Sequence, residues 1–311
     1  MKNLPQFVDV NEQVAEALRS NKPIVALEST IITHGMPYPQ NAEMAANVES
    51  IIAQEGATPA TIAVMDGRLK IGITRDERER LAQAQGAMKL SRADFGFALS
   101  QGCTGGTTVA ATMIAADLTG ITVFATGGIG GVHKGAEETF DISADLEELS
   151  QTPVIVVSAG AKAILDIEKT LEVLETKGVP VVGFGTDIMP AFWSRESPYR
   201  APLRLDEPED IANFFSTRAK LGLRGGMLIA NPVPEAHEIP ALQMAVHIKA
   251  AHDKAMGDGI SGKSVTPYLL AEILKLTDGL SLKTNIALVE NNARLAARIA
   301  IAVSKESRPA R

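Results

Sequence analysis

The sequence predicts an α/β protein, a three-layer α/β/α sandwich whose mostly parallel (mixed) central sheet lies between two helical layers. Short runs rich in Val, Ile and Phe alternate with longer segments in which apolar residues recur at helical spacing. Several short runs are apolar at consecutive positions, which is typical of strands covered on both faces. A chain of 311 residues is long enough to bury a core of this kind.

The predicted strands share a short length and a high content of β-branched or aromatic residues. They are Ile24–Leu27, Thr61–Met65, Phe95–Leu99, Ile121–Ala125, Val154–Val157, Val179–Phe184 and Met227–Ala230. The predicted helices are Asn41–Glu55, Thr107–Leu118, Ala161–Lys177, Ile239–Met256, Thr266–Thr277 and Leu282–Val303. We expect one domain over residues 1–311 with a mainly helical C-terminal portion at about 231–305. The proline-rich segment Met189–Pro208, which holds the only Trp, is expected to be a packed loop or subunit contact rather than a substrate lid.

Composition excludes several classes of partner. The chain carries 30 Lys and Arg against 37 Asp and Glu, so its net charge of -7 gives no general attraction for nucleic acid or anionic lipid. A single cysteine excludes an internal disulfide framework and suits a reducing compartment. Because neither a signal-peptide pattern nor a membrane span is visible, we expect a cytoplasmic protein without nucleic-acid or membrane partners.

Two ionisable residues follow predicted strands, at the sheet edge where ligands bind in open α/β folds. Desolvation of Glu28 would raise its pKa and allow general acid catalysis, and pairing with a structural arginine or a helix N-terminus is the equal alternative. Lys162 stands near the start of a predicted helix among small residues. The helix dipole and apolar surroundings there favour a neutral, nucleophilic amine, and a surface lysine is the alternative.

Further polar and glycine-rich segments are candidates for ligand contacts. Gly127–Gly131 could bring backbone N–H groups to a phosphate or sugar, or could be a sharp turn. Asp141 and Asp145 could bind Mg²⁺ or Mn²⁺, although capping of the next helix by Asp141 is the preferred interpretation. Cys103 is expected to be a packing residue rather than a nucleophile.

The segment Gly257–Ser264 matches the phosphate-binding pattern GxxxxGK[ST]. The pattern normally follows a strand, whereas the preceding segment here has helical periodicity, so we expect a connection between helices. A small-molecule kinase that uses this segment stays as an alternative, as does a non-catalytic sugar-phosphate-binding protein.

Six segments in a fixed order resemble the pseudouridine-5'-phosphate glycosidase family, which includes the indigoidine synthase A proteins. They are Ala26–Pro37, Lys89–Arg92, Gly127–His133, Asp141–Leu146, Ser158–Lys162 and Thr284–Asn292. The resemblance extends from about Val25 to Ala302. It implies reversible cleavage of the C–C glycosidic bond of pseudouridine 5'-phosphate to uracil and ribose 5-phosphate.

The resemblance also implies roles for individual residues. Lys162 corresponds to the nucleophile, which would form a lysine-linked, ring-opened ribose intermediate, and Glu28 corresponds to the proton donor. Asp141 corresponds to the ligand of a divalent cation, typically Mn²⁺ or another such as Mg²⁺. Substrate contacts are implied for Lys89, Val109, Ser143, Ala144, Asp145, Thr126, His133 and Asn285. An α/β/α fold and a homotrimer are implied as well.

Overall fold

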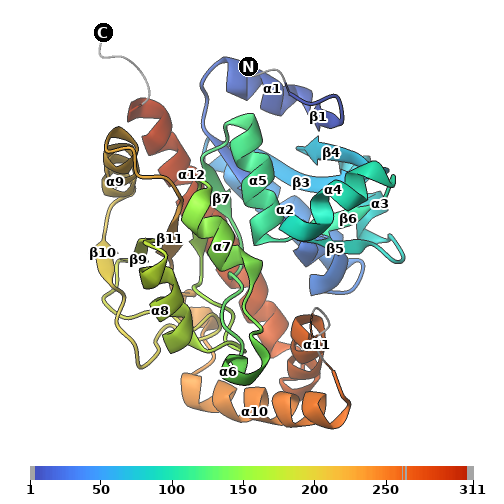
Figure 1. Cartoon of the computed structure of the whole chain (residues 1–311), viewed down its shortest axis with the longest axis vertical. Coiled ribbons are helices and arrows are strands. Elements are labelled where there is room, and N and C mark those ends of the chain that lie inside the picture. The colour runs from blue at the N-terminus through green and yellow to red at the C-terminus, as the bar shows by residue number, and fades with distance from the viewer. Residues whose placement is uncertain (1–3, 261, 263–264, 307–311) are drawn as a thin grey trace.

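The computed structural model describes residues 4–260, 262 and 265–306 and confirms an α/β fold with a mixed, mostly parallel sheet (Figure 1). The strands are β1 (Val8–Val10), β2 (Ile24–Leu27), β3 (Thr58–Met65), β4 (Arg68–Ile71), β5 (Met88–Leu90), β6 (Gly105–Thr107), β7 (Val123–Ala125), β8 (Ile155–Ser158), β9 (Val181–Phe184), β10 (Leu203–Leu205) and β11 (Met227–Ala230). The strand order in the sheet is β1-β4-β3-β2-β7-β8-β11-β9-β10. β6 pairs with both β3 and β5 outside this order. β3 pairs antiparallel with β4 and β6, whereas β2, β7, β8, β11 and β9 are consecutively parallel.

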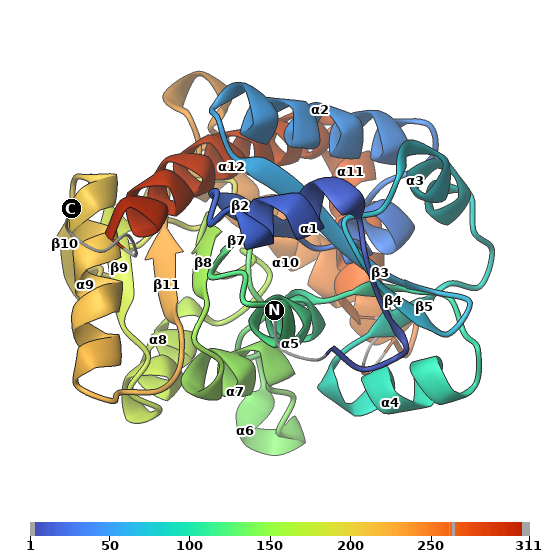
Figure 2. The same ribbon diagram turned by 90° about the horizontal axis from the view of Figure 1, so that it is seen from above.

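Helices cover both faces of this sheet (Figure 2). On one face lie α2 (Gln40–Gln54) and α12 (Leu280–Glu306), and α12 packs across β2, β7 and β8. On the other face lie α4 (Arg92–Ser100), α5 (Val109–Thr119), α7 (Ala144–Gln151) and α8 (Ile167–Thr176). The remaining helices are α1 (Glu12–Arg19), the π-helical turn η1 (Ile31–Gly35), α3 (Arg75–Ala82), α6 (Ala136–Thr139), α9 (Pro208–Lys220), the 3₁₀ turn η2 (Glu235–His237), α10 (Ala241–Gly257) and α11 (Val265–Leu276).

The central strands explain the consecutive apolar runs of the sequence. All four positions of β2, of β8 and of β11 are buried, because helices press on both faces of the sheet. Within the described ranges no helix is long and apolar enough to cross a membrane.

Two predicted elements are wrong. Phe95–Leu99 is not a strand but part of α4, which begins with a capping box between Ser91 and Asp94. Its buried residues, Phe95 and Ala98, have helical spacing. The helix predicted over Ala161–Lys177 starts only at Ile167, because Asp166 caps it by accepting a hydrogen bond from Lys169 N at 3.0 Å.

The segment Met189–Pro208 is a packed loop that ends in β10 and the start of α9, as expected for its packing. Phe192 and Trp193 are buried with their rings edge to face, 5.0 Å between centroids. The indole Nε1 of Trp193 donates to Ser281 O at 3.2 Å, which fixes this loop against α12.

Asn292 of α12 joins the helix to the sheet. It is fully buried, its Nδ2 donates to Thr126 O at 2.8 Å, and its Oδ1 accepts from Asn231 Nδ2 at 3.0 Å. Thr126 and Asn231 directly follow β7 and β11. One amide therefore ties α12 to the ends of two strands.

We expect Asn292→Leu to lower the free energy of unfolding by about 2–5 kcal/mol, since it leaves a buried carbonyl and a buried amide without partners. Urea denaturation followed by circular dichroism measures this change. The exposed Asn213 of α9 provides the control, and Asn213→Leu should change stability by about 0.5 kcal/mol or less. Equal effects of the two substitutions would contradict this role of Asn292.

Candidate active site

The site lies at the carboxyl ends of three adjacent parallel strands. Glu28 directly follows β2, Thr126 follows β7, and Lys162 lies in the loop after β8. A cavity of about 300 Å³ opens at this edge. Its wall contains nine residues of the predicted site: Glu28, Lys89, Val109, His133, Asp141, Ser143, Ala144, Asp145 and Lys162. The structure therefore brings together residues that are far apart in the sequence.

Glu28 lines this cavity and is half-buried. Burial raises the pKa of its carboxyl group, while the positive charge of Lys162 and a hydrogen bond from Thr126 Oγ1 act in the opposite direction. Thr126 is itself held by N–H donation to Val157 O at 3.0 Å and by the Asn292 amide. The carboxyl group is thus placed to keep or release a proton inside the cavity.

Lys162 is positioned by backbone pairing and not by a helix. Its N–H donates to Ile129 O at 3.1 Å, and Ile129 N donates to Gly160 O at 3.0 Å, which extends the β7–β8 pairing. The predicted contribution of a helix dipole to Lys162 is wrong, because α8 begins after this loop at Ile167.

The glycine-rich segment Gly127–Gly131 is a close-packed turn. A Cβ at Gly128 would lie 2.6 Å from the Phe192 ring, and one at Gly130 would lie 2.2 Å from Ser143 Oγ. The N–H groups of Ile129 and Gly130 already donate to Gly160 O and to Asp145 Oδ2. These two amides are therefore engaged within the protein and do not cradle a phosphate.

Asp145 is the most heavily engaged carboxylate at the site. Its side chain accepts from Ala110 N at 2.9 Å and from Gly130 N at 2.8 Å, and the residue is only 5% exposed. Ser143 caps α7 by accepting from Asp145 N at 3.2 Å, so the predicted capping role of Asp141 is wrong.

Asp141 instead presents a partly exposed carboxylate to the cavity. Its Oδ2 lies 3.9 Å from His133 Nδ1, and burial lowers the pKa of that imidazole. Among residues 4–260, 262 and 265–306, no three His, Cys, Asp or Glu side chains converge as a metal-binding group. One partly exposed carboxylate on a cavity wall does fit a largely hydrated Mg²⁺ or Mn²⁺ ion.

A smaller cavity of about 60 Å³ adjoins the first and shares Glu28, Thr30, Lys89 and Lys162 with it. Asn285 of α12 and Phe192 belong to its wall. Thr30 Oγ1 and Asn285 Oδ1 are buried and have no hydrogen-bond partner among the described residues. The sequence interpretation missed Thr30 and Phe192, although Thr30 stands two positions after Glu28 at the end of β2.

The phosphate-binding pattern at Gly257–Ser264 lacks the structural context of a nucleotide site. Gly257 is the last residue of the 17-residue helix α10, and no strand leads into the segment. Ser261, Lys263 and Ser264 lie outside the described residues, while Gly262 and Thr266 contribute to the wall of the 300 Å³ cavity. Cys103 packs against the core, as expected.

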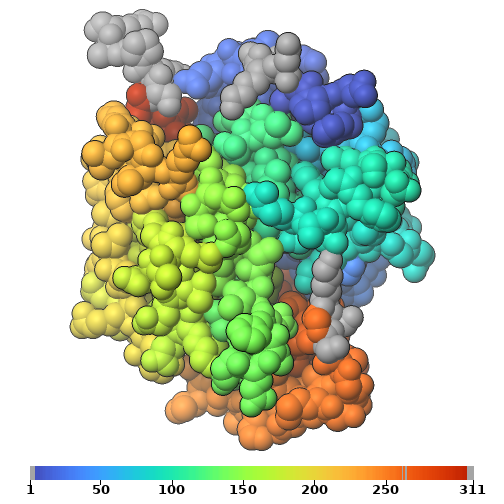
Figure 3. Space-filling model, viewed as in Figure 1, coloured from blue at the N-terminus to red at the C-terminus, as the bar shows by residue number. Residues whose placement is uncertain are grey.

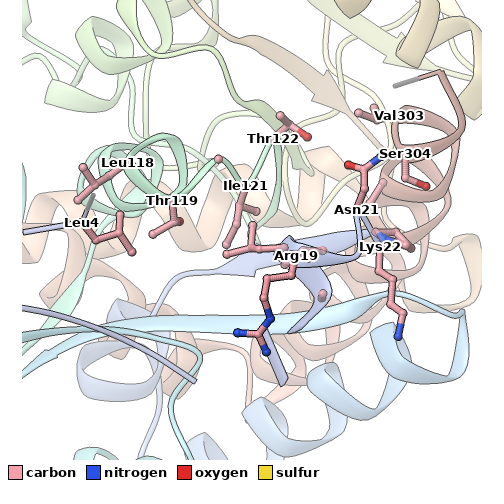
Figure 4. Close-up of a pocket in the computed structure, with 16 residues that line it drawn as sticks. Leu4, Arg19, Asn21, Lys22, Leu118, Thr119, Ile121, Thr122, Val303 and Ser304 are labelled. Atoms are coloured by element: carbon pink, nitrogen blue, oxygen red, sulfur yellow. The ribbon is translucent and has the colours of Figure 1, made fainter. Parts of the chain in front are cut away.

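A larger cavity of about 670 Å³ lies at the opposite edge of the sheet (Figure 4). Its wall includes Lys22 and Ile24 at the start of β2 and Ile121 and Thr122 just before β7. Arg19, which also lines it, forms ion pairs with glutamates of its own helix. This cavity is at the amino ends of strands whose carboxyl ends carry Glu28 and Thr126, so it is separate from the candidate active site.

The raised pKa of Glu28 gives a pH dependence to stability. The folded state holds this proton more tightly than the unfolded state, so ionisation destabilises the fold as the pH rises from 4.5, the ordinary glutamate value, through the raised value. We expect Glu28→Gln to match the parent in Tm at about pH 4 and to exceed it at about pH 8. Thermal unfolding at both pH values measures this, with the exposed Glu172→Gln as control. A Tm difference that is independent of pH would contradict it.

Asp145→Asn tests how much the two hydrogen bonds that the Asp145 carboxylate accepts from backbone N–H groups contribute to stability. The asparagine would turn an NH₂ group toward one backbone N–H donor, which should lower the free energy of unfolding by about 1–3 kcal/mol. Urea denaturation measures the loss. The neighbouring exposed change Glu147→Gln should have little effect, and equal stability of Asp145→Asn and the parent would show that the two hydrogen bonds are dispensable.

Comparison with known proteins shows similarity over almost the entire chain. Pseudouridine-5'-phosphate glycosidases of Mesorhizobium japonicum and Dinoroseobacter shibae are 71% and 61% identical to it. The alignments cover 96% and 97% of this chain and 97% and 99% of those proteins.

Two solved structures have the same fold. The prealnumycin C-glycosynthase AlnA in complex with ribulose 5-phosphate superposes with a TM-score of 0.90 at 37% identity, covering 97% of this chain and 98% of that one. An indigoidine synthase A-like protein from Thermotoga maritima gives a TM-score of 0.87 at 32% identity, covering 98% and 99%. The model of the family "Indigoidine synthase A like protein" matches residues 13–302. The chain therefore belongs to the indigoidine synthase A-like family.

Proposed function

We propose that this protein cleaves the C–C glycosidic bond of pseudouridine 5'-phosphate to uracil and ribose 5-phosphate, and that it also runs the reverse reaction. The observation that carries the proposal is the meeting of Glu28 and Lys162 in one cavity of about 300 Å³. The high identity to pseudouridine-5'-phosphate glycosidases supports the substrate.

A lysine together with a glutamate, here Lys162 and Glu28, suits cleavage of a C–C glycosidic bond better than cleavage of a C–O glycosidic bond. Enzymes that cleave C–O glycosides generally use two carboxylates, one of which protonates a departing oxygen. In a C-nucleoside the departing atom is a ring carbon without a lone pair. A lysine amine at the sugar carbon solves this problem, because its lone pair can expel the carbon group as a C=N bond forms.

We infer the following steps. Lys162 Nζ attacks C1' and displaces the ring oxygen, which takes up the proton that Nζ gives up, so the ribose opens. The nitrogen lone pair then forms a C=N bond while the C1'–C5 bond breaks, and the electrons of that bond pass to C5 of uracil. Glu28 supplies the proton that C5 takes up. One water hydrolyses the imine and releases ribose 5-phosphate, so the balance is one water consumed for each uracil formed.

The other end of the cavity suits the phosphate. Lys89, Ser143 and the imidazole of His133 belong to this wall, beside the N-terminus of α5 at Val109. Asp141 would hold a hydrated Mn²⁺ or Mg²⁺ ion there. When bound, the ion would supply positive charge that orients the phosphorylated sugar.

We propose the homotrimer and the cytoplasmic location on the basis of the family resemblance. The bound ribulose 5-phosphate of the C-glycosynthase AlnA supports a phosphorylated sugar as the ligand class.

The cavity is bordered by α11, which together with α10 forms the lower end of the molecule in the orientation of Figure 3. The side chain of His252 of α10 hydrogen bonds Ile164 O at 3.1 Å, which connects this helix to the loop of Lys162.

The test is incubation of the purified protein with pseudouridine 5'-phosphate and Mn²⁺, with free uracil measured by chromatography. We expect Lys162→Met to lower kcat by a factor of about 10³ or more, because the nucleophile is lost. Borohydride reduction during turnover should attach the ribose phosphate to Lys162, located by peptide mass spectrometry.

Lys134→Met is the matched control, since Lys134 is exposed near the cavity but does not line it. A reduced adduct on another residue, or none, would overturn the imine step. Binding of the substrate without release of uracil would instead favour a non-catalytic sugar-phosphate-binding protein.

A further inference from the structure

A third cavity continues the active site on the side away from the phosphate end. It has a volume of about 270 Å³, and we call it the outer chamber. Its wall consists of Thr33, His34, Gly35, Met36, Pro37, Trp193, Pro267, Leu270, Ala271, Leu274, Ser281, Leu282 and Asn285. The outer chamber shares His34, Gly35, Pro267, Leu270 and Asn285 with the 60 Å³ cavity that touches Glu28 and Lys162.

The order of the three cavities gives a direction to the bound substrate. In the proposed function the phosphate lies near Ser143 and His133, which line the 300 Å³ cavity alone, and Lys162, which lines both this cavity and the 60 Å³ cavity, marks the position of C1'. The group bonded to C1' must then point into the 60 Å³ cavity, toward Phe192 and Asn285. The outer chamber is the continuation of that path.

The junction between the two cavities contains two polar side chains, those of His34 and Asn285. Asn285 Oδ1 is buried without a hydrogen-bond partner among the described residues, and Asn285 belongs to both walls. Thr30 Oγ1, in the same condition, borders the inner cavity. A buried acceptor without a hydrogen-bond partner lowers the stability of the fold. A bound heterocycle with N–H groups would supply the missing donor.

Beyond the junction the wall is largely apolar and firmly held. Trp193 is anchored by its hydrogen bond to Ser281 O and by its edge contact with Phe192. Met36 and Pro37 come from the end of η1, and Leu270 and Leu274 come from α11. Such a surface has little to offer a bare uracil ring and suits an apolar group attached to it.

We propose that the site accepts C-ribosyl 5'-phosphates whose pyrimidine carries an apolar substituent on the edge remote from the ribose, with the substituent lying in the outer chamber. This inference rests on the proposed function and names a wider class of substrate for the same site. The reaction is unchanged: one water is consumed, the C1'–C5 bond breaks, and the substituted uracil and ribose 5-phosphate are released.

The experiment compares pseudouridine 5'-phosphate with its N1-benzyl and N3-benzyl derivatives. We expect at least one benzyl derivative to be cleaved with a kcat/KM within about tenfold of the parent substrate. If both derivatives fall more than about tenfold below the parent, the proposal is overturned. If the parent substrate itself is not cleaved, the proposed function fails instead.

A filled chamber provides the second measurement. Ala271→Trp places a large side chain in the outer chamber from an exposed helical position, and it should lower the ratio of benzyl to parent kcat/KM by about tenfold or more. Ala219→Trp makes the same change at an exposed position of α9 and should leave the ratio unchanged. A ratio that Ala271→Trp fails to lower would place the substituent elsewhere and overturn the assignment of the chamber.

Discussion

A single buried carboxylate, that of Asp145, determines how the walls of the active site meet. It accepts one hydrogen bond from the first turn of α5 and one from the glycine-rich turn after β7, while its own helix α7 starts from Ser143. The Asp145 carboxylate thus holds three segments together. They are the start of α5 at Val109, the start of α7 at Ser143, and the glycine-rich turn whose Ile129 O accepts from Lys162 N. The same contacts explain why Gly130 has no room for a side chain.

Around this framework the cavity brings residues of both charges together in a small part of an acidic molecule. The net charge is -7, yet Lys89, Lys162 and His133 belong to one cavity wall. Glu28 lines the same wall as Lys89 and Lys162, so burial and these positive charges act on its pKa in opposite directions. Aromatic residues are only 4% of the chain, but Phe192 and Trp193 line the two cavities that continue from the candidate active site. Scarcity of aromatics in the composition therefore says little about their placement.

The sequence was sufficient to predict the central strands and much of the site. Runs such as Val154–Val157 are apolar because both faces are covered, and that pattern is visible in the sequence alone. Glu28 and Lys162 were recognisable as polar residues that follow such strands. By contrast β6, Gly105–Thr107, has no strand pattern. It is defined by pairing with β3 and β5, and a Cβ at Gly105 would lie 2.5 Å from Met88 O.

The remaining errors arise where tertiary contacts decide between similar local patterns. Phe95–Leu99 has the composition of a strand, but capping by Ser91 and burial of one helical stripe make it part of α4. Phe192 enters the site only because the 189–208 segment folds back on the sheet. No local spacing in the sequence encodes that approach.

The contact of Asn292 with Thr126 has a consequence for synthesis of the protein. The residue that orients Glu28 is held by a helix that the ribosome makes last among the described elements. A nascent chain that already contains Glu28, Thr126 and Lys162 still lacks the amide that satisfies Thr126 O and the helix that covers β2, β7 and β8. A chain that lacks α12 therefore cannot make the hydrogen bond that holds Thr126 O or complete the cavity wall at Asn285.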